Sequence, residues 1–118
     1  MKADSAMEIT STIDGGVAVF NIVGRLDFAT SEHLEQAVNT AIEGGNRRVI
    51  FDMRQVGYVS SAGLRAILIA AKKAKSAGGG VAVFGLQAGV AEIFATSGFD
   101  KIVPIASSDA QAREQLGA

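Results

Sequence analysis

The stretch DMRQVGYVSSAGLR, residues 52–65, leads from the end of an apolar segment into a long amphipathic one. Two adjacent serines, Ser60 and Ser61, stand where this pattern predicts the start of a helix. The first turn of a helix has unpaired backbone N–H groups and the positive end of the helix dipole. A hydroxyl at this place suits a helix cap, a nucleophile, or an acceptor for a phosphate, which a helix N-terminus accommodates well.

The residues before this stretch predict a hairpin followed by a helix. Alternation of apolar and polar residues indicates a strand, and an Asp-Gly-Gly run tolerates the positive φ angles of a hairpin turn. A glycine pair is a common helix end. The expected elements are a strand over 7–13, a turn over 14–16, a more apolar strand over 17–23, an exit loop over 24–29, a helix capped by Thr30 or Ser31 and ended by 44–45, and a strand over 48–51 that leads to Asp52.

The residues after it predict further alternation of helices and strands. The helix that follows the serines directs Leu64, Ile67, Leu68 and Ala71 inward. The remaining expected elements are the end of that helix at 78–80, a strand over 81–84, a helix around 88–96, a short edge strand at 102–103 before Pro104, and a final helix capped by Ser108 that ends near Gly117.

This order, β-β-α-β-α-β-α-(β)-α, predicts an α/β fold. The opening hairpin is an antiparallel pair, and strands joined through helices are parallel with right-handed crossovers. We therefore expect a small mixed sheet with about four helices packed on it. Asp27, the serine pair and the loop at 86–87 then lie at one carboxyl-end edge, where open α/β sheets place their binding sites.

Composition restricts the class of protein. The chain has 118 residues, of which 48% are hydrophobic, and it has no cysteine, so disulfides and thiolate metal sites are excluded. Eleven basic and twelve acidic residues give a net charge of −1, which argues against direct nucleic-acid binding. No apolar run approaches the ~18 residues that span a bilayer, so we expect no membrane insertion and a cytoplasmic protein. Residues 1–6 are expected to be a disordered lead-in, and residues 7–118 one domain.

The motifs of the common enzyme classes are missing. A serine-hydrolase elbow needs a glycine two residues before the nucleophile, and neither serine has it. His33 is the only histidine and falls in the first predicted helix, which makes a Ser-His pair or a histidine zinc site hard to assemble. Neither glycine-rich phosphate-binding motif occurs. We therefore expect no enzyme, cofactor or metal.

Without reference to any family, Ser60 and Asp27 at this edge both have ordinary structural explanations. Ser60 is explained as a helix N-cap, which stabilises a helix by roughly 0.5–2 kcal/mol. That interpretation leaves the second serine unexplained. Asp27, taken by itself, is a solvated loop carboxylate.

The stretch resembles the signature of the STAS domain, in particular of bacterial anti-sigma-factor antagonists. That family has an Asp-Ser-Ser/Thr-Gly-Leu run at the start of this helix, and its phosphorylated serine lies two residues before the glycine. Gly63-Leu64 matches the Gly-Leu, which puts Ser61 at the phosphoacceptor position, Ala62 in place of the second small residue, and Ser60 in place of the aspartate. The run 24–27, Gly-Arg-Leu-Asp, is similar to the family's Gly-x-Leu-Asp and makes Asp27 the matching carboxylate; residues 94–99 also resemble a family segment.

The resemblance implies a protein-binding module that regulates transcription by partner switching. Unphosphorylated, it would bind an anti-sigma factor, often itself a serine kinase. Phosphorylation of Ser61 would release that partner, and a serine phosphatase would reset the switch. The alternative is a scaffold subunit, for instance of a lipid-trafficking ABC complex, that docks a partner without regulated phosphorylation.

The helix that begins at Ser61 is expected to form much of the partner surface. Arg65, Ala66 and Ile69 lie away from its inward stripe, although Ile69 fits a core position equally well. We expect Arg65, Ile69 and Phe28 to contact the partner, with Asp27, Ser60, Ala62 and Gly63 supporting the phosphorylation site.

Overall fold

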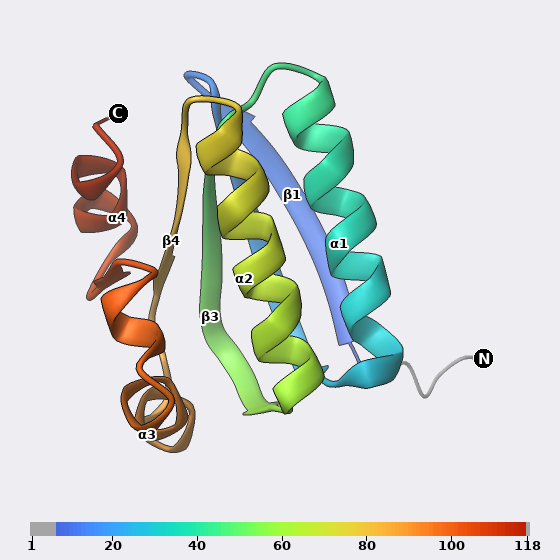
Figure 1. Cartoon of the computed structure of the whole chain (residues 1–118), viewed down its shortest axis with the longest axis vertical. Helices are drawn as coiled ribbons and strands as arrows, with labels where there is room; N and C mark the ends of the chain where they lie inside the picture. The colour runs from blue at the N-terminus through green and yellow to red at the C-terminus, as the bar shows by residue number, and fades with distance from the viewer. Residues whose placement is uncertain (1–6, 118) are drawn as a thin grey trace.

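The computed structural model describes residues 7–117, so the expectation for residues 1–6 lies outside the described part (Figure 1). Its strands form one five-stranded sheet in the order β1-β2-β3-β4-β5. The strands are β1 (Met7–Asp14), β2 (Val17–Leu26), β3 (Arg48–Val59), β4 (Gly80–Phe84) and β5 (Ile105–Ala106). The helices are α1 (Phe28–Glu43), α2 (Ser61–Ser76), α3 (Ala88–Thr96), the 3-10 turn η1 (Phe99–Lys101) and α4 (Asp109–Gln115).

The predicted topology is confirmed. β1 and β2 are antiparallel, and each later pair of neighbouring strands is parallel. Gly15 and Gly16 form the hairpin turn with φ angles of +61° and +82°, which glycine adopts without steric cost. The α/β fold with a mixed sheet therefore follows from the chain order.

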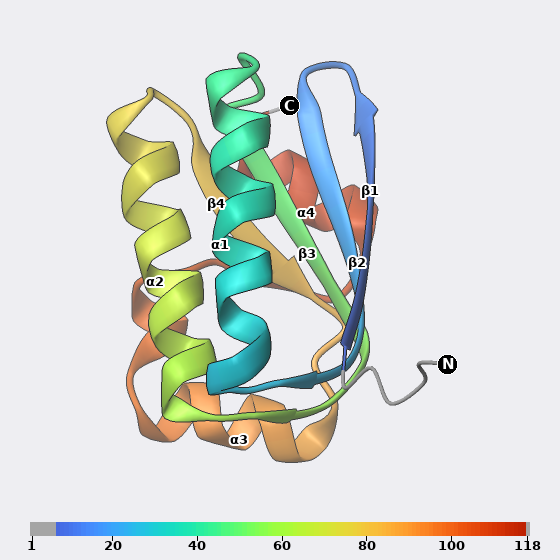
Figure 2. The same ribbon diagram turned by 90° about the vertical axis from the view of Figure 1, so that its right-hand side faces the viewer.

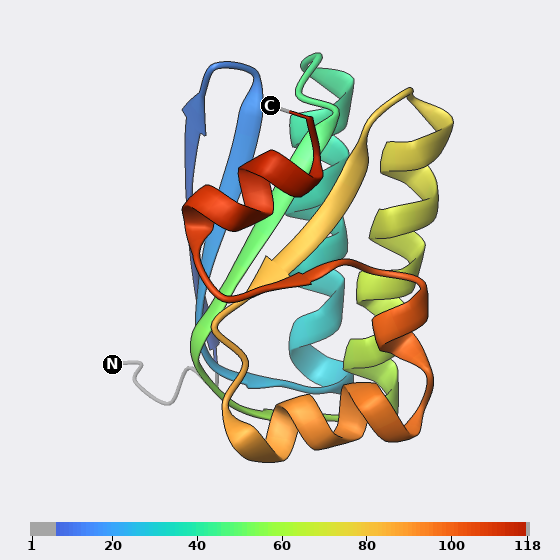
Figure 3. The ribbon, with the colours of Figure 1, turned by 90° about the vertical axis from the view of Figure 1, so that its left-hand side faces the viewer.

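Helices cover both faces of the sheet. α1 and α2 lie side by side on one face, above the larger apolar core, and α4 lies across the other face on a smaller cluster around Ile50 and Phe84 (Figures 2 and 3). α3 crosses the carboxyl ends of the strands (Figure 3). The central strands are apolar on both sides because both of their faces are covered.

β3 is longer than predicted, because it continues from Phe51 to Val59. The polar residues after Phe51 therefore lie within the strand, where Arg54 donates two side-chain hydrogen bonds to Asp52, of 3.0 and 2.8 Å. The Arg54 guanidinium also holds the pKa of the buried Asp52 carboxyl below its usual value. The register with β2 shifts twice along this extension, and β2 itself runs on to Leu26.

The predicted edge strand at 102–103 is wrong by three residues. Residues 99–101 form the η1 turn, and Val103 is buried in the core instead. Pro104 precedes the strand, and its carbonyl accepts a hydrogen bond from the Val83 N–H (3.0 Å). β5 therefore begins at Ile105, after the residue that has no N–H to donate.

Within residues 7–117, none of the helices combines the length and the apolar character that crossing a membrane requires.

The first turn of α2 rests directly on the ends of two strands. A Cβ atom placed on Gly63 would lie 2.5 Å from the carbonyl oxygen of Leu26 and 3.1 Å from a methyl group of Val59. Leu26 and Val59 are the last residues of β2 and β3 and are paired in register. Glycine is required at this position because the helix and the strand backbone approach so closely.

We predict that Gly63→Ala lowers the free energy of unfolding by about 1–3 kcal/mol, because the added methyl group must displace the strand end or the helix. Gly89→Ala is the matched control: a Cβ on this α3 glycine would meet nothing within 4 Å. It should leave stability unchanged or raise it by up to about 1 kcal/mol. Denaturant unfolding measures both, and equal effects of the two substitutions would contradict the close-approach explanation.

Candidate functional site

Two helix N-termini lie side by side at the carboxyl edge of the sheet. Asp27 follows β2 and is the N-cap of α1, and Ser60 follows β3 and is the N-cap of α2. The Ser60 backbone N–H donates a hydrogen bond of 2.9 Å to the carbonyl of Leu26, which ties the two caps together. The prediction that these residues share one edge is therefore confirmed.

Asp27 caps α1 through a reciprocal capping box with Thr30. Its carboxylate accepts a hydrogen bond from the Thr30 N–H (3.1 Å), and its own N–H donates to the Thr30 hydroxyl (2.9 Å). The prediction that Thr30 or Ser31 caps this helix is wrong, because the helix begins at Phe28 and the Ser31 hydroxyl donates to the Phe28 carbonyl within the first turn. The box satisfies two otherwise unpaired N–H groups and so favours the earlier start.

The Asp27 carboxylate is a fixed negative charge at this edge. The hydrogen bond from the Thr30 backbone is the main cause that holds the Asp27 pKa below its usual value, and Arg25, whose Nε lies 3.8 Å away, acts in the same direction. The side chain remains 26% exposed, so its charge reaches the surface. The Arg25 guanidinium in turn stacks 4.2 Å above the centre of the Tyr58 ring.

The two serines have different environments. The Ser60 hydroxyl accepts the Gly63 N–H (3.1 Å), which confirms its predicted role as the cap. Ser61 is the first residue of α2 and is exposed. Of the two hydroxyls, that of Ser61 is the one open to a reagent or a partner.

Ser61 lies in a shallow groove between the first halves of α1 and α2. The open hollow at this end of the groove measures about 570 Å³. It is lined by Ser61, Ala62, Arg65 and Ile69 of α2 and by Phe28, Ser31, Glu32 and Glu35 of α1. Phe28 is 76% exposed, more than any other large hydrophobic side chain among the described residues. We call this end of the groove the Ser61 hollow.

The structure brings most of the predicted site residues together, with one error. The hollow is lined by Phe28, Ser61, Ala62, Arg65 and Ile69, whereas Gly63 is buried on the inner face of α2. Ala66 was expected to be exposed and is fully buried, because the inner face of α2 is made of its small residues. That face comprises Gly63, Ala66, Ile67, Ala70 and Ala74, with Leu64, Leu68 and Ala71 partly buried beside it.

Sequence reasoning missed the two acidic residues of the hollow, Glu32 and Glu35. The helical spacing of residues 28, 32 and 35 puts them on one face of α1, and this signal was available in the sequence. The sequence does not show which face of α1 packs toward α2.

The remaining polar candidates do not join the hollow. The Gln87 side chain donates to the Arg54 carbonyl (3.1 Å), and so it braces β3. His33 is exposed and is absent from the lining of the Ser61 hollow. Among residues 7–117, no group of three or more His, Cys, Asp or Glu side chains is placed to hold a metal ion.

The fold and these motifs define a known class of domain. A family model of the STAS domain matches residues 8–112, and the chain belongs to this family. BtrV of Bordetella bronchiseptica, provisionally named an anti-sigma factor antagonist, is 34% identical over 102 residues, which cover 86% of this chain and 88% of BtrV.

Solved structures of anti-sigma factor antagonists share the fold. One from Mycobacterium paratuberculosis superposes over the whole of both chains with a TM-score of 0.86 and 20% identity. Bacillus SpoIIAA in its unphosphorylated form covers 94% of this chain and 98% of its own, with a TM-score of 0.79 and 18% identity. A structure of SpoIIAA in its phosphorylated form is similar as well, with a TM-score of 0.70, 17% identity, and coverage of 93% of this chain and 98% of its own.

We predict that Asp27→Asn lowers stability at neutral pH and that the difference from the wild type disappears in acid. The lowered pKa of Asp27 means that its ionised form contributes stability above the usual aspartate pKa of 3.8, and that this contribution is lost as the pH falls through the folded-state value. Denaturant unfolding of both proteins at about pH 7 and at about pH 2 tests this. A difference of the same size at both pH values would contradict it.

Proposed function

We propose that this chain is an anti-sigma factor antagonist whose binding is switched by phosphorylation of Ser61. In this proposal the Ser61 hollow and the adjoining caps capture an anti-sigma factor that is also a serine kinase, which frees a sigma factor in the cytoplasm. The observation that carries the proposal is the exposed Ser61 hydroxyl at the start of α2, at the edge where the ionised Asp27 caps α1. The names of the curated relatives support the antagonist part of this proposal.

The chemistry of the proposed switch is a phosphoryl transfer and its hydrolysis. The kinase transfers the γ-phosphoryl group of ATP to Ser61 Oγ, and ADP and the hydroxyl proton leave. A serine phosphatase then hydrolyses the phosphoserine with water and releases inorganic phosphate. The chain itself acts as the binding protein in this cycle.

The size of the charge change favours release without unfolding. A phosphate adds about −1.5 to −2 charges at neutral pH. At a helix N-terminus it gains roughly 0.3–1 kcal/mol from the dipole, so it is compatible with the fold. In a complex built around a neutral hydroxyl, the same charge is buried without a partner and costs several kcal/mol. Glu32 and Glu35 in the hollow and Asp27 at the neighbouring cap are further negative charges near the modified serine.

The partner surface in this proposal comprises Phe28, Arg65 and Ile69. Phe28 supplies a large exposed apolar side chain in the same hollow as Ser61, and aromatic side chains and arginine are enriched at protein interfaces. All three line the same hollow as the phosphoacceptor. A phosphate on Ser61 would therefore stand inside the contact area.

A scaffold role without phosphorylation is the second candidate, and the neutral Ser60 favours it. The family's aspartate at this place would put a carboxylate beside the phosphoacceptor, whereas Ser60 supplies the cap without the charge. A kinase that recognises that carboxylate would find it missing here.

We predict that Ser61→Asp weakens binding to the anti-sigma factor recovered with the native protein by about 100-fold, a loss that corresponds to the several kcal/mol of an uncompensated charge. Ser61→Ala should keep the affinity. Ser60→Asp is the matched control, because it adds the same charge one residue earlier, at a cap position that favours aspartate. Calorimetry measures the affinities, and unfolding experiments show that each variant is folded. Wild-type affinity of Ser61→Asp, or equal losses for the two aspartate variants, would contradict the switch.

Incubation with that anti-sigma factor and ATP, followed by mass spectrometry, separates the two candidate functions. The switch requires a phosphate on Ser61 and no phosphorylation of Ser61→Ala. If the partner proves to be an active kinase and the wild-type chain stays unmodified, the scaffold role is the better account.

A further inference from the structure

Arg65 stands one helical turn after Ser61 and lines the same hollow. Residues four apart on a helix are neighbours, and an anion placed N-terminal to a cation at this spacing is the favourable order. Both side chains are exposed. A phosphate on Ser61 and the Arg65 guanidinium are therefore within reach of each other without any change in the backbone.

The other arginines near this edge already have partners. Arg25 lies beside Asp27 and over Tyr58, and Arg54 is bound to Asp52 by two hydrogen bonds. Arg65, in contrast, has no ion pair within residues 7–117, although Glu32 and Glu35 line the same hollow. Of these three arginines, Arg65 is the one whose guanidinium is open to a new anion.

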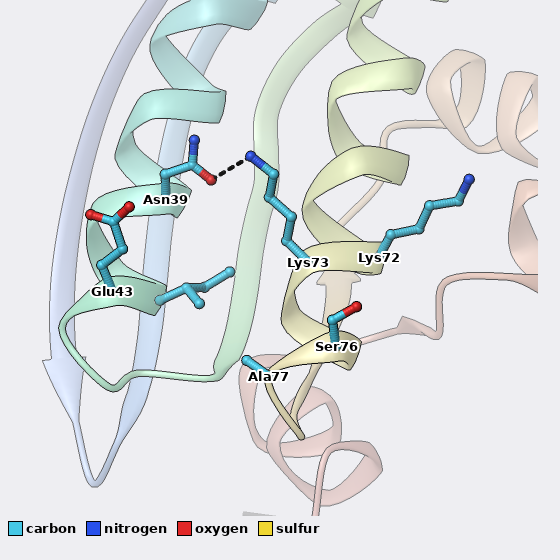
Figure 4. A pocket seen from close by; sticks show the side chains of 7 residues that line it. Asn39, Glu43, Lys72, Lys73, Ser76 and Ala77 are labelled. Atoms are coloured by element: carbon cyan, nitrogen blue, oxygen red, sulfur yellow. Dashed lines mark hydrogen bonds between the residues drawn. The ribbon is translucent and has the colours of Figure 1, made fainter.

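The lysines of α2 are too distant to take this role. Lys72 and Lys73 line a second hollow, of about 530 Å³, at the opposite end of the α1–α2 groove (Figure 4). There the Lys73 ammonium donates to the Asn39 side chain (2.8 Å). Lys72 lies eleven positions after Ser61 on the helix, a rise of roughly 16 Å. That distance exceeds the Debye length of about 8 Å at physiological salt, so these charges are screened from Ser61.

We propose that Arg65 binds the phosphate of phosphorylated Ser61 and is thereby drawn away from the partner surface. The inference rests on the proposed function, because it takes Ser61 as the phosphoacceptor. In the unphosphorylated protein the guanidinium is available to the partner. After phosphorylation it is held along α2 by the phosphate, and the interface loses a cation while it gains a dianion.

The neutral Ser60 is consistent with this arrangement. An aspartate at the cap would stand next to the phosphate and would compete with it for a nearby cation. Here the cap is a hydroxyl that accepts the Gly63 N–H, and the acidic side chains of the site stand across the groove on α1. The first turns of α2 therefore contain no carboxylate that would compete with the phosphate for Arg65.

The test is a ³¹P NMR pH titration of the full chain with phosphoserine inserted at position 61 during translation. A nearby cation favours the dianion, so Arg65 should lower the second pKa of the phosphate from its ordinary value of about 6. Arg65→Gln should raise that pKa by about 0.3 relative to the unsubstituted phosphoprotein. Arg65→Lys should restore part of the effect, because it keeps the charge and loses the bidentate geometry.

Two further substitutions are controls within the same site. Arg25→Gln removes the neighbouring arginine that Asp27 engages and should leave the phosphate titration unchanged. Glu35→Gln removes a like charge from the hollow and should lower the pKa of the phosphate. If Arg65→Gln leaves the titration as it was, or if Arg25→Gln shifts it as much, the proposal is overturned.

The pairing of Arg65 with the phosphate and the effect of the phosphate on partner binding are measured separately, so either can fail alone. Suppose that the pKa of the phosphate depends on Arg65 but the affinity for the partner is the same with and without the phosphate. The proposed function is then refuted, and the pairing of Arg65 with the phosphate is supported. If the pKa of the phosphate does not depend on Arg65 but the phosphate abolishes partner binding, the pairing is refuted and the proposed function is supported.

Discussion

The site depends on the close approach between the first turn of α2 and the paired ends of β2 and β3. The hydrogen bond from Ser60 to Leu26 and the contact of Gly63 with the same residue hold this junction. Each strand end passes directly into a helix cap, so the pairing of the strands also sets the spacing of the caps. The position of Ser61 at the start of α2 therefore follows from main-chain contacts between the helix and the strand ends.

The electrostatics of the edge follow from the two caps. Asp27 is kept ionised by the N–H groups that it caps, and Ser60 caps the second helix without a charge. Around the Ser61 hollow there are thus one fixed carboxylate at the neighbouring cap, two glutamates on α1, and on α2 an arginine that forms no ion pair with residues 7–117. A neutral hydroxyl is compatible with these surroundings, whereas a phosphate changes the charge at the centre of the surface that would meet a partner.

The topology and the shared edge could be predicted from sequence because periodicity and chain order determine them. The length of β3 could not be predicted, since polar residues such as Arg54 and Gln55 after an apolar strand are typical of a turn. The structure shows that Arg54 binds Asp52 and that the strand continues. Alanine fits either side of a helix, so the burial of Ala66 depended on how α2 sits on the sheet. Family resemblance indicated that Asp27 belongs to the site. Its role as the cap of α1 could be recognised only from the backbone conformation in the structure. The presence of Glu32 and Glu35 in the hollow could not be predicted without knowing which face of α1 is turned toward α2.

The central claim is that a phosphate on Ser61 acts at the binding surface and leaves the fold intact. The most direct measurement compares the phosphoserine-61 protein with the unmodified chain, by amide hydrogen exchange and by affinity for the anti-sigma factor. The account predicts the same protection of α2 and of the sheet, with a free energy of unfolding changed by no more than about 1 kcal/mol and an affinity at least about 100-fold lower. Loss of protection along α2, or unchanged affinity, would contradict it.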